Sequence, residues 1–215
     1  MALTYAGCVG ISRYAHPPSE KFAEIDTAAT QQVIEIAPSG ENIFKAVITG
    51  WSYEKKTWKR IFGPWPAVIG RNGLAPDGEE REGDGRTPSG TYRITRAFGT
   101  AKELNTGLDY RQTTGDDVWI DDSASTRYNE WAILPTDAAS YERMKRDDGL
   151  YDLGAVIEYN TSPVVPGHGS AIFIHIWRDN GNAPTAGCVA LDRIRLKRLL
   201  KWLRAERSPV IILHE

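Results

Sequence analysis

Cys188 and His175 are the two residues whose side chains could together perform acyl transfer. A cysteine thiol is mostly protonated at neutral pH, and a neighbouring imidazole that accepts its proton leaves a thiolate nucleophile. Gly187 directly precedes the cysteine and suits a sharp turn, where backbone N–H groups can hold the oxyanion of a tetrahedral intermediate. Taken alone, the pair is also compatible with a buried cysteine and a core histidine that have no catalytic role.

The pair depends on two strands that must lie side by side. His175 lies in an apolar run at residues 171–176, and the period of two of a strand places Phe173, His175 and Trp177 on one face. A second strand is predicted at residues 188–191. If the loop between the strands returns the chain as a hairpin, Cys188 lies beside His175.

The other elements predict a mainly β fold, in one domain of mixed sheets or a sandwich with a few short helices. Strands are expected at residues 33–36, 44–48, 66–69, 91–98, 117–120, 131–134, 155–159 and 210–213. Residues 138–147 have helical composition. A second helix is expected near the C-terminus at residues 193–204, with Asp192 as N-cap and an apolar stripe formed by Ile194, Leu199, Trp202 and Leu203.

Two further segments have a plain and a functional interpretation. The basic residues of the C-terminal helix indicate a solvated face, or a docking surface for an anionic cell-wall polymer. The glycine-rich residues 70–90 match no phosphate-binding pattern and form either a cleft wall or lid, or an ordinary surface loop. Residues 1–30 are predicted to be an irregular N-terminal lead-in, and residues 31–215 the folded domain.

Composition excludes several classes of protein. The chain has 215 residues, 41% of them hydrophobic and 25% charged, and its net charge of −2 gives no reason to expect a nucleic-acid partner. Two cysteines form no disulfide framework, and the four histidines lack metal-ligand spacing, so we expect no metal or other cofactor. No run is long and apolar enough for a membrane span. The oligomeric state is left open.

Four segments resemble the L,D-transpeptidase (YkuD-like) catalytic domain family. His175 followed by Thr185-Ala186-Gly187-Cys188-Val189 is similar to the family's histidine and Ser/Thr-x-Gly-Cys signature, and residues 83–92 look like its G-x-x-x-TP-x-G-x-F/Y segment. Residues 121–129 and 169–175 are similar to one branch of the family. The resemblance extends over residues 31–214. It implies a β-rich enzyme that acylates its cysteine with a peptidoglycan stem peptide, cleaves an L–D peptide bond and passes the acyl group to an amine.

Carried over to this sequence, the resemblance makes Cys188 the nucleophile and His175 the general base, oriented by a backbone carbonyl. It gives Gly187 and Cys188 oxyanion N–H groups and places Thr185 at the substrate. Two positions depart from the family's Ser-His-Gly-Cys-hydrophobic-Arg pattern, because the chain has Ala186 and Ala190 there. The candidates to replace that arginine in carboxylate recognition are Arg178, His168, Arg86 and Arg71. Trp65 and Tyr128 are candidates for stacking on glycan.

Three functions stay open at this point. The thioester passes to an amine, giving a cross-link, or to water, giving an L,D-carboxypeptidase, or the chain is a non-catalytic wall-binding module. The resemblance implies carbapenems as inhibitors and a periplasmic or extracellular location, with any export signal absent from this chain. Because a second free thiol is a liability in such a compartment, we expect Cys8 to be exposed, mobile and dispensable.

Overall fold

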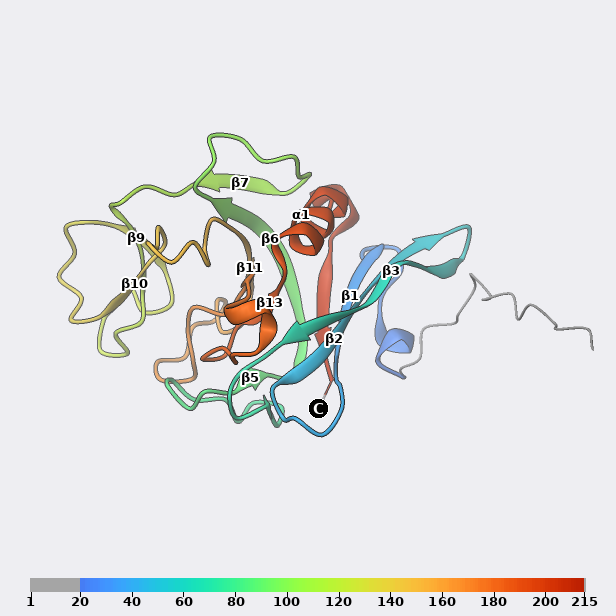
Figure 1. Cartoon of the computed structure of the whole chain (residues 1–215), viewed down its shortest axis with the longest axis horizontal. Helices are drawn as coiled ribbons and strands as arrows, with labels where there is room; N and C mark the ends of the chain where they lie inside the picture. Colours follow the sequence, from blue (N-terminus) through green and yellow to red (C-terminus); the bar gives the residue numbers. More distant parts are fainter. Residues whose placement is uncertain (1–19, 215) are drawn as a thin grey trace, which may run out of the picture.

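A curved sheet of nine strands forms the centre of the molecule, a computed structural model that describes residues 20–214 (Figure 1). In spatial order its strands are β11 (Leu153–Ile157), β12 (Phe173–Ile176), β13 (Val189–Leu191), β3 (Thr57–Val68), β2 (Lys45–Glu54), β1 (Gln32–Pro38), β14 (Val210–Leu213), β6 (Gly90–Gly99) and β7 (Asp109–Gln112). Because β11 also pairs with β6, the sheet closes into a barrel-like ring, with β7 appended. The predicted mainly β fold is confirmed.

Smaller elements surround this sheet. A three-stranded sheet has the order β10 (Tyr141–Arg143), β8 (Asp117–Ile120) and β9 (Trp131–Ile133), and β4 (Leu74–Ala75) pairs with β5 (Thr87–Pro88). The helices are α1 (Arg193–Trp202) and the short 3-10 turns η1 (Glu20–Glu24), η2 (Asp179–Gly181) and η3 (Ala205–Arg207). Within residues 20–214, no helix is long and apolar enough to cross a membrane.

Every strand predicted from the sequence overlaps an observed one, but β2 and β3 are longer than the strands predicted at residues 44–48 and 66–69, and they form one hairpin. These strands pair from Lys45 with Val68 to Glu54 with Thr57. Lys55 and Lys56 both have positive φ, 51° and 63°, and form the turn between them. The register of the pair shifts at Gly50, where the Phe62 ring packs against the backbone and a Cβ would lie 2.2 Å from that ring.

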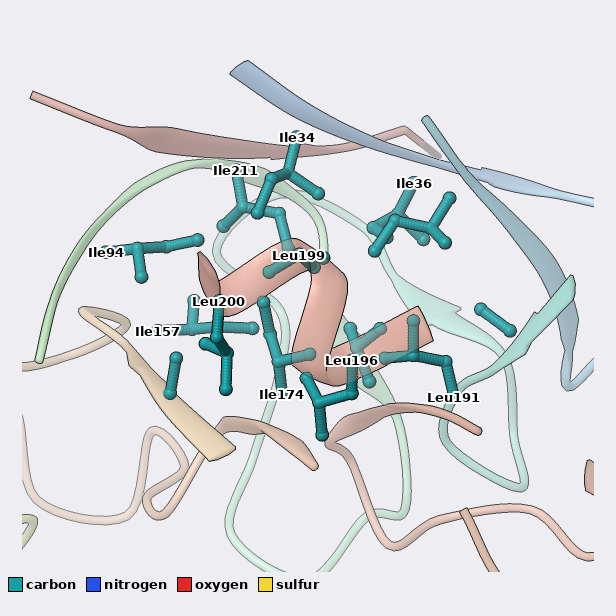
Figure 2. Packing of buried hydrophobic residues seen from close by; sticks show 14 of the residues in the cluster. Ile34, Ile36, Ile94, Ile157, Ile174, Leu191, Leu196, Leu199, Leu200 and Ile211 are labelled. Carbon is teal, nitrogen blue, oxygen red and sulfur yellow. The ribbon is translucent and has the colours of Figure 1, made fainter. Parts of the chain in front are cut away.

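The core lies between α1 and the concave side of the sheet. Leu196, Leu199 and Leu200 are fully buried among isoleucines of the surrounding strands (Figure 2). Leu203, directly after α1, is fully buried in the same cluster. Burial of a leucine side chain contributes roughly 1.5–3 kcal/mol. Asp192 caps α1 as predicted, accepting from the N–H groups of Ile194 and Arg195. The predicted stripe is partly wrong, because Ile194 is 81% exposed. Ile194 and Leu199 are five positions apart in the sequence, so their side chains point about 140° away from each other around the helix axis and do not share one face.

The helix predicted at residues 138–147 is wrong. Tyr141 to Arg143 form β10, which pairs with β8 from Tyr141 with Ile120 to Arg143 with Val118. Met144 follows, fully buried, and its N–H donates to the Asp117 carbonyl. Pairing with β8 overrides the local helical preference, which is a weak determinant when tertiary contacts compete with it.

The hairpin predicted between His175 and Cys188 is also wrong, because β12 and β13 run parallel. Residues 177–188 form the crossover that parallel strands require. Phe173 and His175 share a face as predicted. Trp177 lies beyond the end of β12 and packs instead against the main core.

Residues 1–19 lie outside the described part of the chain, and so do Cys8 and most of the predicted lead-in. The boundary at residue 31 stays a prediction. In the described segment before it, Phe22 of η1 packs edge-on against Trp51 and Trp58, with ring centroids 5.8 and 5.4 Å apart.

Candidate active site

A cleft of about 530 Å³ lies against the outward face of β12 and contains both Cys188 and His175. The loop that follows β10 forms one wall, and the glycine-rich loop forms part of another. Its lining comprises Glu80, Glu82, Gly83, Asp121, Tyr141, Glu142, Arg143, Arg146, Leu150, Tyr151, Ser170, Ala171, His175, Arg178, Pro184, Thr185, Ala186, Gly187 and Cys188. Of the two interpretations of residues 70–90, the structure agrees with a cleft wall.

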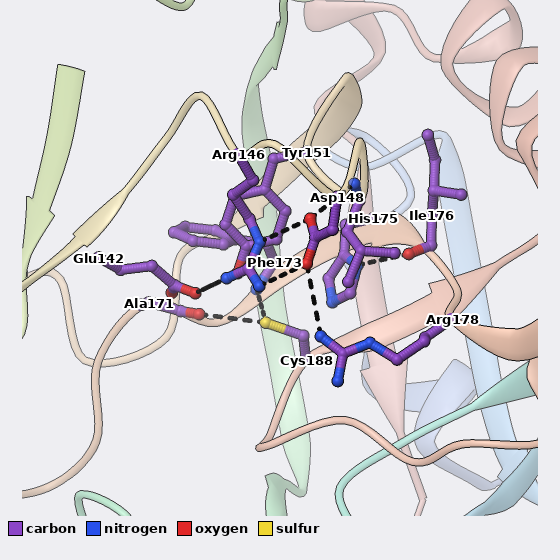
Figure 3. A network of polar contacts seen from close by, with 11 residues as sticks. Glu142, Arg146, Asp148, Tyr151, Ala171, Phe173, His175, Ile176, Arg178 and Cys188 are labelled. Atoms are coloured by element: carbon purple, nitrogen blue, oxygen red, sulfur yellow. Dashed lines mark hydrogen bonds and ion pairs between the residues drawn. The ribbon is translucent and has the colours of Figure 1, made fainter. Parts of the chain in front are cut away.

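The strand register places the cysteine on the same face as the histidine. His175 is the partner of Ala190 in the parallel pair, and Cys188 lies two residues before Ala190. The Cys188 thiol donates to the Ala171 carbonyl at 3.2 Å and accepts from the Phe173 N–H at 3.3 Å (Figure 3). Only 8% of the cysteine is exposed. The thiol is thus held at the inner edge of the cleft.

Ala171 has an unusual conformation beside the thiol. Its φ is 55°, a left-handed value that is costly for a residue with a side chain. Its N–H donates to Oδ1 of Asn129 at 3.1 Å, and the same oxygen accepts from Trp119 Nε1 at 2.8 Å. The Asn129 amide donates to the carbonyls of Tyr159 and Asn160. Asn129 therefore positions the carbonyl that contacts Cys188.

Thr185 closes the turn that carries the cysteine. Its hydroxyl donates to the Cys188 carbonyl at 2.6 Å and accepts from the Gly187 N–H at 3.2 Å. A Cβ on Gly187 would lie 2.8 Å from the Arg86 carbonyl oxygen, so this turn needs glycine. The predicted oxyanion donor Gly187 thus has its N–H already engaged by Thr185.

The imidazole of His175 is buried and held from both sides. Nδ1 lies 2.8 Å from the Ile176 carbonyl oxygen, and the Tyr151 ring contacts the imidazole edge-on with centroids 5.1 Å apart. A carbonyl accepts only, so Nδ1 carries the proton and Nε2 is the basic nitrogen. Burial lowers the pKa of His175 to about 4, and the imidazole is therefore neutral at neutral pH.

The thiol is also neutral at rest. Burial raises the pKa of Cys188 to about 12, and the negative charge of nearby Glu142 acts in the same direction. The resting pair is a thiol and a neutral imidazole, not a preformed thiolate and imidazolium. Any nucleophilic attack by this sulfur requires proton removal as the substrate reacts.

An ion-pair network covers the thiol side of the cleft (Figure 3). Arg146 donates to both carboxylate oxygens of Asp148, at 3.0 and 2.7 Å, and to Glu142 at 3.1 Å. Tyr151 donates to the same Glu142 oxygen at 2.8 Å. These hydrogen bonds from Arg146 lower the pKa of Asp148 to about 2. Arg146 is therefore locked in place by two carboxylates.

The predicted replacements for the family arginine separate into two groups. Arg178 lines the cleft, with 61% of its side chain exposed, and lies 3.4 Å from Asp148. His168, Arg86 and Arg71 do not line it, and Arg71 instead donates to the Gly83 carbonyl within the glycine-rich loop.

The two aromatic candidates for glycan stacking also lie outside the cleft lining. Trp65 stacks on Phe62, with ring centroids 4.3 Å apart, and Tyr128 is 2% exposed and donates to Glu82. Both side chains are engaged in contacts within the protein and are not positioned to stack on a ligand in the cleft.

The sequence analysis did not identify several charged residues of the cleft lining, which come from the loop after β10 and from the glycine-rich loop. Glu142, Arg146 and Tyr151 fall in or just after the segment assigned to a helix, where the spacing of Glu142 and Arg146 fits a helical ion pair. Glu80 and Glu82 lie in the glycine-rich loop, for which a cleft wall was one of two interpretations, and there only Arg71 and Arg86 were named as candidates. Within residues 20–214, no group of three or more His, Cys, Asp or Glu side chains could hold a metal ion.

Comparison with known proteins identifies the class that this fold and site define. The family model of the YkuD L,D-transpeptidase catalytic domain matches residues 21–212, nearly the whole chain. The chain belongs to this family, and the resemblance found in the sequence is confirmed.

More distant comparisons add little. Among solved structures, the Bdellovibrio bacteriovorus protein Bd1075 is similar at 15% identity with a TM-score of 0.45, over 87% of this chain and 49% of that one. The chain thus spans about half the length of that protein, and a likeness this distant supports no statement about function. No curated protein matches the sequence.

Proposed function

We propose that the protein is a cysteine acyltransferase that acts on peptidoglycan stem peptides, with Cys188 as nucleophile and His175 as general base. One observation carries the proposal. The thiol and the imidazole line the same cleft, and the bond from Nδ1 to Ile176 leaves Nε2 as the basic nitrogen. Membership of the family supports the substrate class.

In the first half-reaction, Nε2 of His175 accepts the thiol proton as Sγ of Cys188 attacks the carbonyl carbon of an L–D peptide bond. The tetrahedral intermediate collapses with loss of the amine, to which the imidazolium returns the proton, and the acyl group stays on sulfur as a thioester. Since the pKa of His175 is about 4, its imidazolium is a strong acid for protonating the leaving amine.

For the oxyanion we assign the backbone N–H of Cys188 as donor. The Gly187 N–H contributes only if it exchanges its bond to Thr185 for one to the substrate. The Tyr151 hydroxyl borders the thiol and stays bonded to Glu142, so its role is to pack against and orient His175. A preorganised donor at the oxyanion typically contributes about 3–4 kcal/mol.

For recognition of the peptide's terminal carboxylate we assign Arg178. Arg146 is bonded to Asp148 and Glu142, whereas Arg178 has one long contact and a largely exposed guanidinium at the cleft. In this assignment Arg178 has the role of the arginine of the family motif, whose position is occupied by Ala190 in this chain.

In the second half-reaction an amine attacks the thioester while Nε2 of the neutral His175 accepts a proton from the attacking nitrogen. The tetrahedral intermediate collapses to an amide and expels the thiolate, to which His175 returns that proton. The product is a cross-link or an anchored lipoprotein. Water as acceptor makes the enzyme an L,D-carboxypeptidase, which is the second candidate function. From this substrate class we infer a location in the periplasm or outside the membrane, and we expect carbapenems to acylate Cys188.

Incubation with a disaccharide tetrapeptide followed by mass analysis of the products tests the proposal. Dimers together with tripeptide support the transferase, whereas tripeptide without any dimer supports the carboxypeptidase. If the Cys188→Ala variant retains all measurable function, the non-catalytic wall-binding module replaces both.

A further inference from the structure

Two residues with left-handed backbone conformations meet next to the thiol. Ala171 has a φ of 55°, and a conformation of this kind costs roughly 1–3 kcal/mol in a residue with a side chain. Its neighbour Asn129 is 4% exposed and has a φ of 60°, which asparagine adopts more readily than most residues do. Ala171 therefore needs a strong contact to stay in its conformation, and Asn129 is placed to supply it.

The side-chain amide of Asn129 makes four hydrogen bonds. Its Oδ1 accepts from Trp119 Nε1 at 2.8 Å and from the Ala171 N–H at 3.1 Å. Its amide nitrogen donates to the carbonyls of Tyr159 at 3.1 Å and Asn160 at 2.7 Å. An amide offers two donor hydrogens and an oxygen with two lone pairs, so these bonds fix the orientation of Asn129 completely. The oxygen that holds Ala171 cannot turn away without loss of the other three bonds.

Two backbone groups contact the sulfur of Cys188, and they act in opposite directions (Figure 3). The Ala171 carbonyl accepts the thiol proton at 3.2 Å, which favours the neutral thiol, whereas the Phe173 N–H donates to Sγ at 3.3 Å, which favours the thiolate. Phe173 is fixed within β12, which pairs with β11 and β13. Ala171 precedes that strand and is held by Asn129. The contact that keeps the thiol protonated is thus the one that depends on Asn129.

We propose that Asn129 is a positioning residue of the nucleophile, which holds Ala171 in its left-handed conformation and so keeps the Ala171 carbonyl on the thiol and Cys188 protonated until the substrate reacts. This inference rests on the proposed function and deepens it, because it names the group that keeps the resting thiol unreactive. Asn129 does not line the cleft, so it acts on the reaction through Ala171.

Removal of the Asn129 side chain should change two rates at Cys188 in opposite directions. Ala171 is then free to leave its left-handed conformation, and its carbonyl turns away while the Phe173 N–H stays on the sulfur. The thiolate becomes more populated, which speeds alkylation. The sulfur also loses one of the two groups that fix its position, and a misplacement of about 1 Å slows a catalysed reaction by up to about 100-fold.

Alkylation by iodoacetamide in a Cys8→Ser background measures the first rate. Asn129→Gly keeps a residue that tolerates a positive φ and should raise the rate at neutral pH about tenfold, as for the loss of one hydrogen bond to the neutral thiol. The rate should also level off at a lower pH than in the parent chain. The variant leaves in place the other groups that act on the thiol, namely Glu142, Arg146 and Tyr151.

Trp131→Phe is the matched control. It also removes a hydrogen bond in the aromatic cluster around Trp119, but the indole of Trp131 donates to Asp117, at 2.7 Å, rather than to Asn129. This variant should leave the alkylation rate and its pH profile unchanged. Urea unfolding of each chain shows how much stability each variant loses.

Acylation by a tetrapeptide measures the second rate. Asn129→Gly should lower the acylation rate constant about tenfold at an unchanged KM, because Asn129 positions the sulfur and lies outside the cleft lining. Asn129→Ser is the milder variant, should Asn129→Gly fail to unfold cooperatively. A hydroxyl has one donor hydrogen where the amide uses two, so both rates should change in the same directions by a smaller factor.

A double variant separates positioning from general loosening of the fold. Ala171→Gly removes the cost of the left-handed conformation, so its addition to Asn129→Gly should bring the alkylation rate back toward that of the parent chain. An increase that this addition does not reverse would assign the effect to packing and overturn the inference. Unchanged alkylation in folded Asn129→Gly, or an equal increase in Trp131→Phe, would overturn it as well.

Failure of the proposed function has a different signature, namely no acyl adduct on Cys188 with any donor in any of these chains. In that case the ratio of the alkylation rates of Asn129→Gly and its parent still decides whether Asn129 controls the thiol.

Discussion

The imidazole of His175 donates from Nδ1 to the carbonyl oxygen of Ile176, the next residue in the chain, at 2.8 Å. A neutral carbonyl fixes the tautomer as an aspartate would, but it stabilises an imidazolium far less than a carboxylate does. Together with burial, this leaves a weakly basic imidazole beside a weakly acidic thiol. The predictions on pH and thiol reactivity follow from this pairing.

The acid limb of the acylation rate is expected near pH 4. Burial lowers the pKa of His175 from 6.5 to about 4, so its Nε2 stays unprotonated, and able to accept the thiol proton, down to that pH. The measurement is the pH dependence of the acylation rate, with circular dichroism at each pH as a control for unfolding. A limb near pH 6.5 in folded protein would contradict the assignment of His175 as a buried neutral base.

Cys188 is expected to react slowly with a small alkylating agent. Burial raises its pKa to about 12, and the thiolate, which is the reactive form, is therefore rare at neutral pH. Alkylation by iodoacetamide, followed by mass in a Cys8→Ser background, should rise steadily with pH without levelling off near pH 8.5. Glu142→Gln should speed it several-fold, because it removes a neighbouring negative charge. A rate that levels off at or below pH 8.5 would sink this account of the resting thiol.

Arg178→Ala is expected to raise KM about tenfold for a tetrapeptide with a free terminal carboxylate, because it removes the exposed guanidinium at the cleft. The C-terminal amide of the same peptide should show no such change. Lys197→Ala is the control variant, because it also removes one positive charge but from an exposed position on α1 that does not line the cleft. Equal effects on the acid and the amide would mean that Arg178 does not read the carboxylate.

Glu80→Gln is expected to stabilise the fold increasingly as pH rises. The folded-state pKa is raised from 4.5 to about 8, so between these values only the folded chain keeps the proton. The free energy of unfolding of the wild type then falls with rising pH, by up to about 1.4 kcal/mol per unit, and the loss is complete above pH 8.

Urea unfolding from about pH 5 to about pH 9 measures this, with Glu79→Gln as control. The stability gained by Glu80→Gln should be small at the lower pH and largest at the upper. A gain that does not vary with pH would contradict the protonation assigned to Glu80.

Local patterns predicted the parts of the fold that local sequence determines. Cys188 and His175 were predicted as a pair because a thiol, a glycine and a strand histidine carry chemistry in their types and spacing, and the structure places both in one cleft. The strands were found because β-branched runs lie between turn residues. The direction of a strand pair was not predictable in this way. A hairpin was expected between His175 and Cys188, whereas β12 and β13 are parallel, because residues 177–188 cross over to the other end of the sheet and no local pattern encodes that path.

The missed residues depend on tertiary contacts. Glu142 and Arg146 have the spacing of a helical ion pair. The structure instead pairs Tyr141 to Arg143 with β8, a contact between distant segments that the local pattern does not contain. Ile194 looked apolar enough for the core, whereas the spacing of Leu196, Leu199, Leu200 and Leu203 decides which side of α1 is buried. Glu80 in a polar loop gave no sign of burial, which results from its packing against Gly169.

The central claim is that Cys188 carries the acyl group. Intact-mass analysis after incubation with a tetrapeptide muropeptide, or with a carbapenem as a slowly released acyl donor, tests it most directly. The account predicts one covalent adduct, mapped to Cys188 by peptide mass, absent in Cys188→Ala and retained in Cys8→Ser. Substrate binding without any adduct on Cys188, or an adduct that persists in Cys188→Ala, would contradict it.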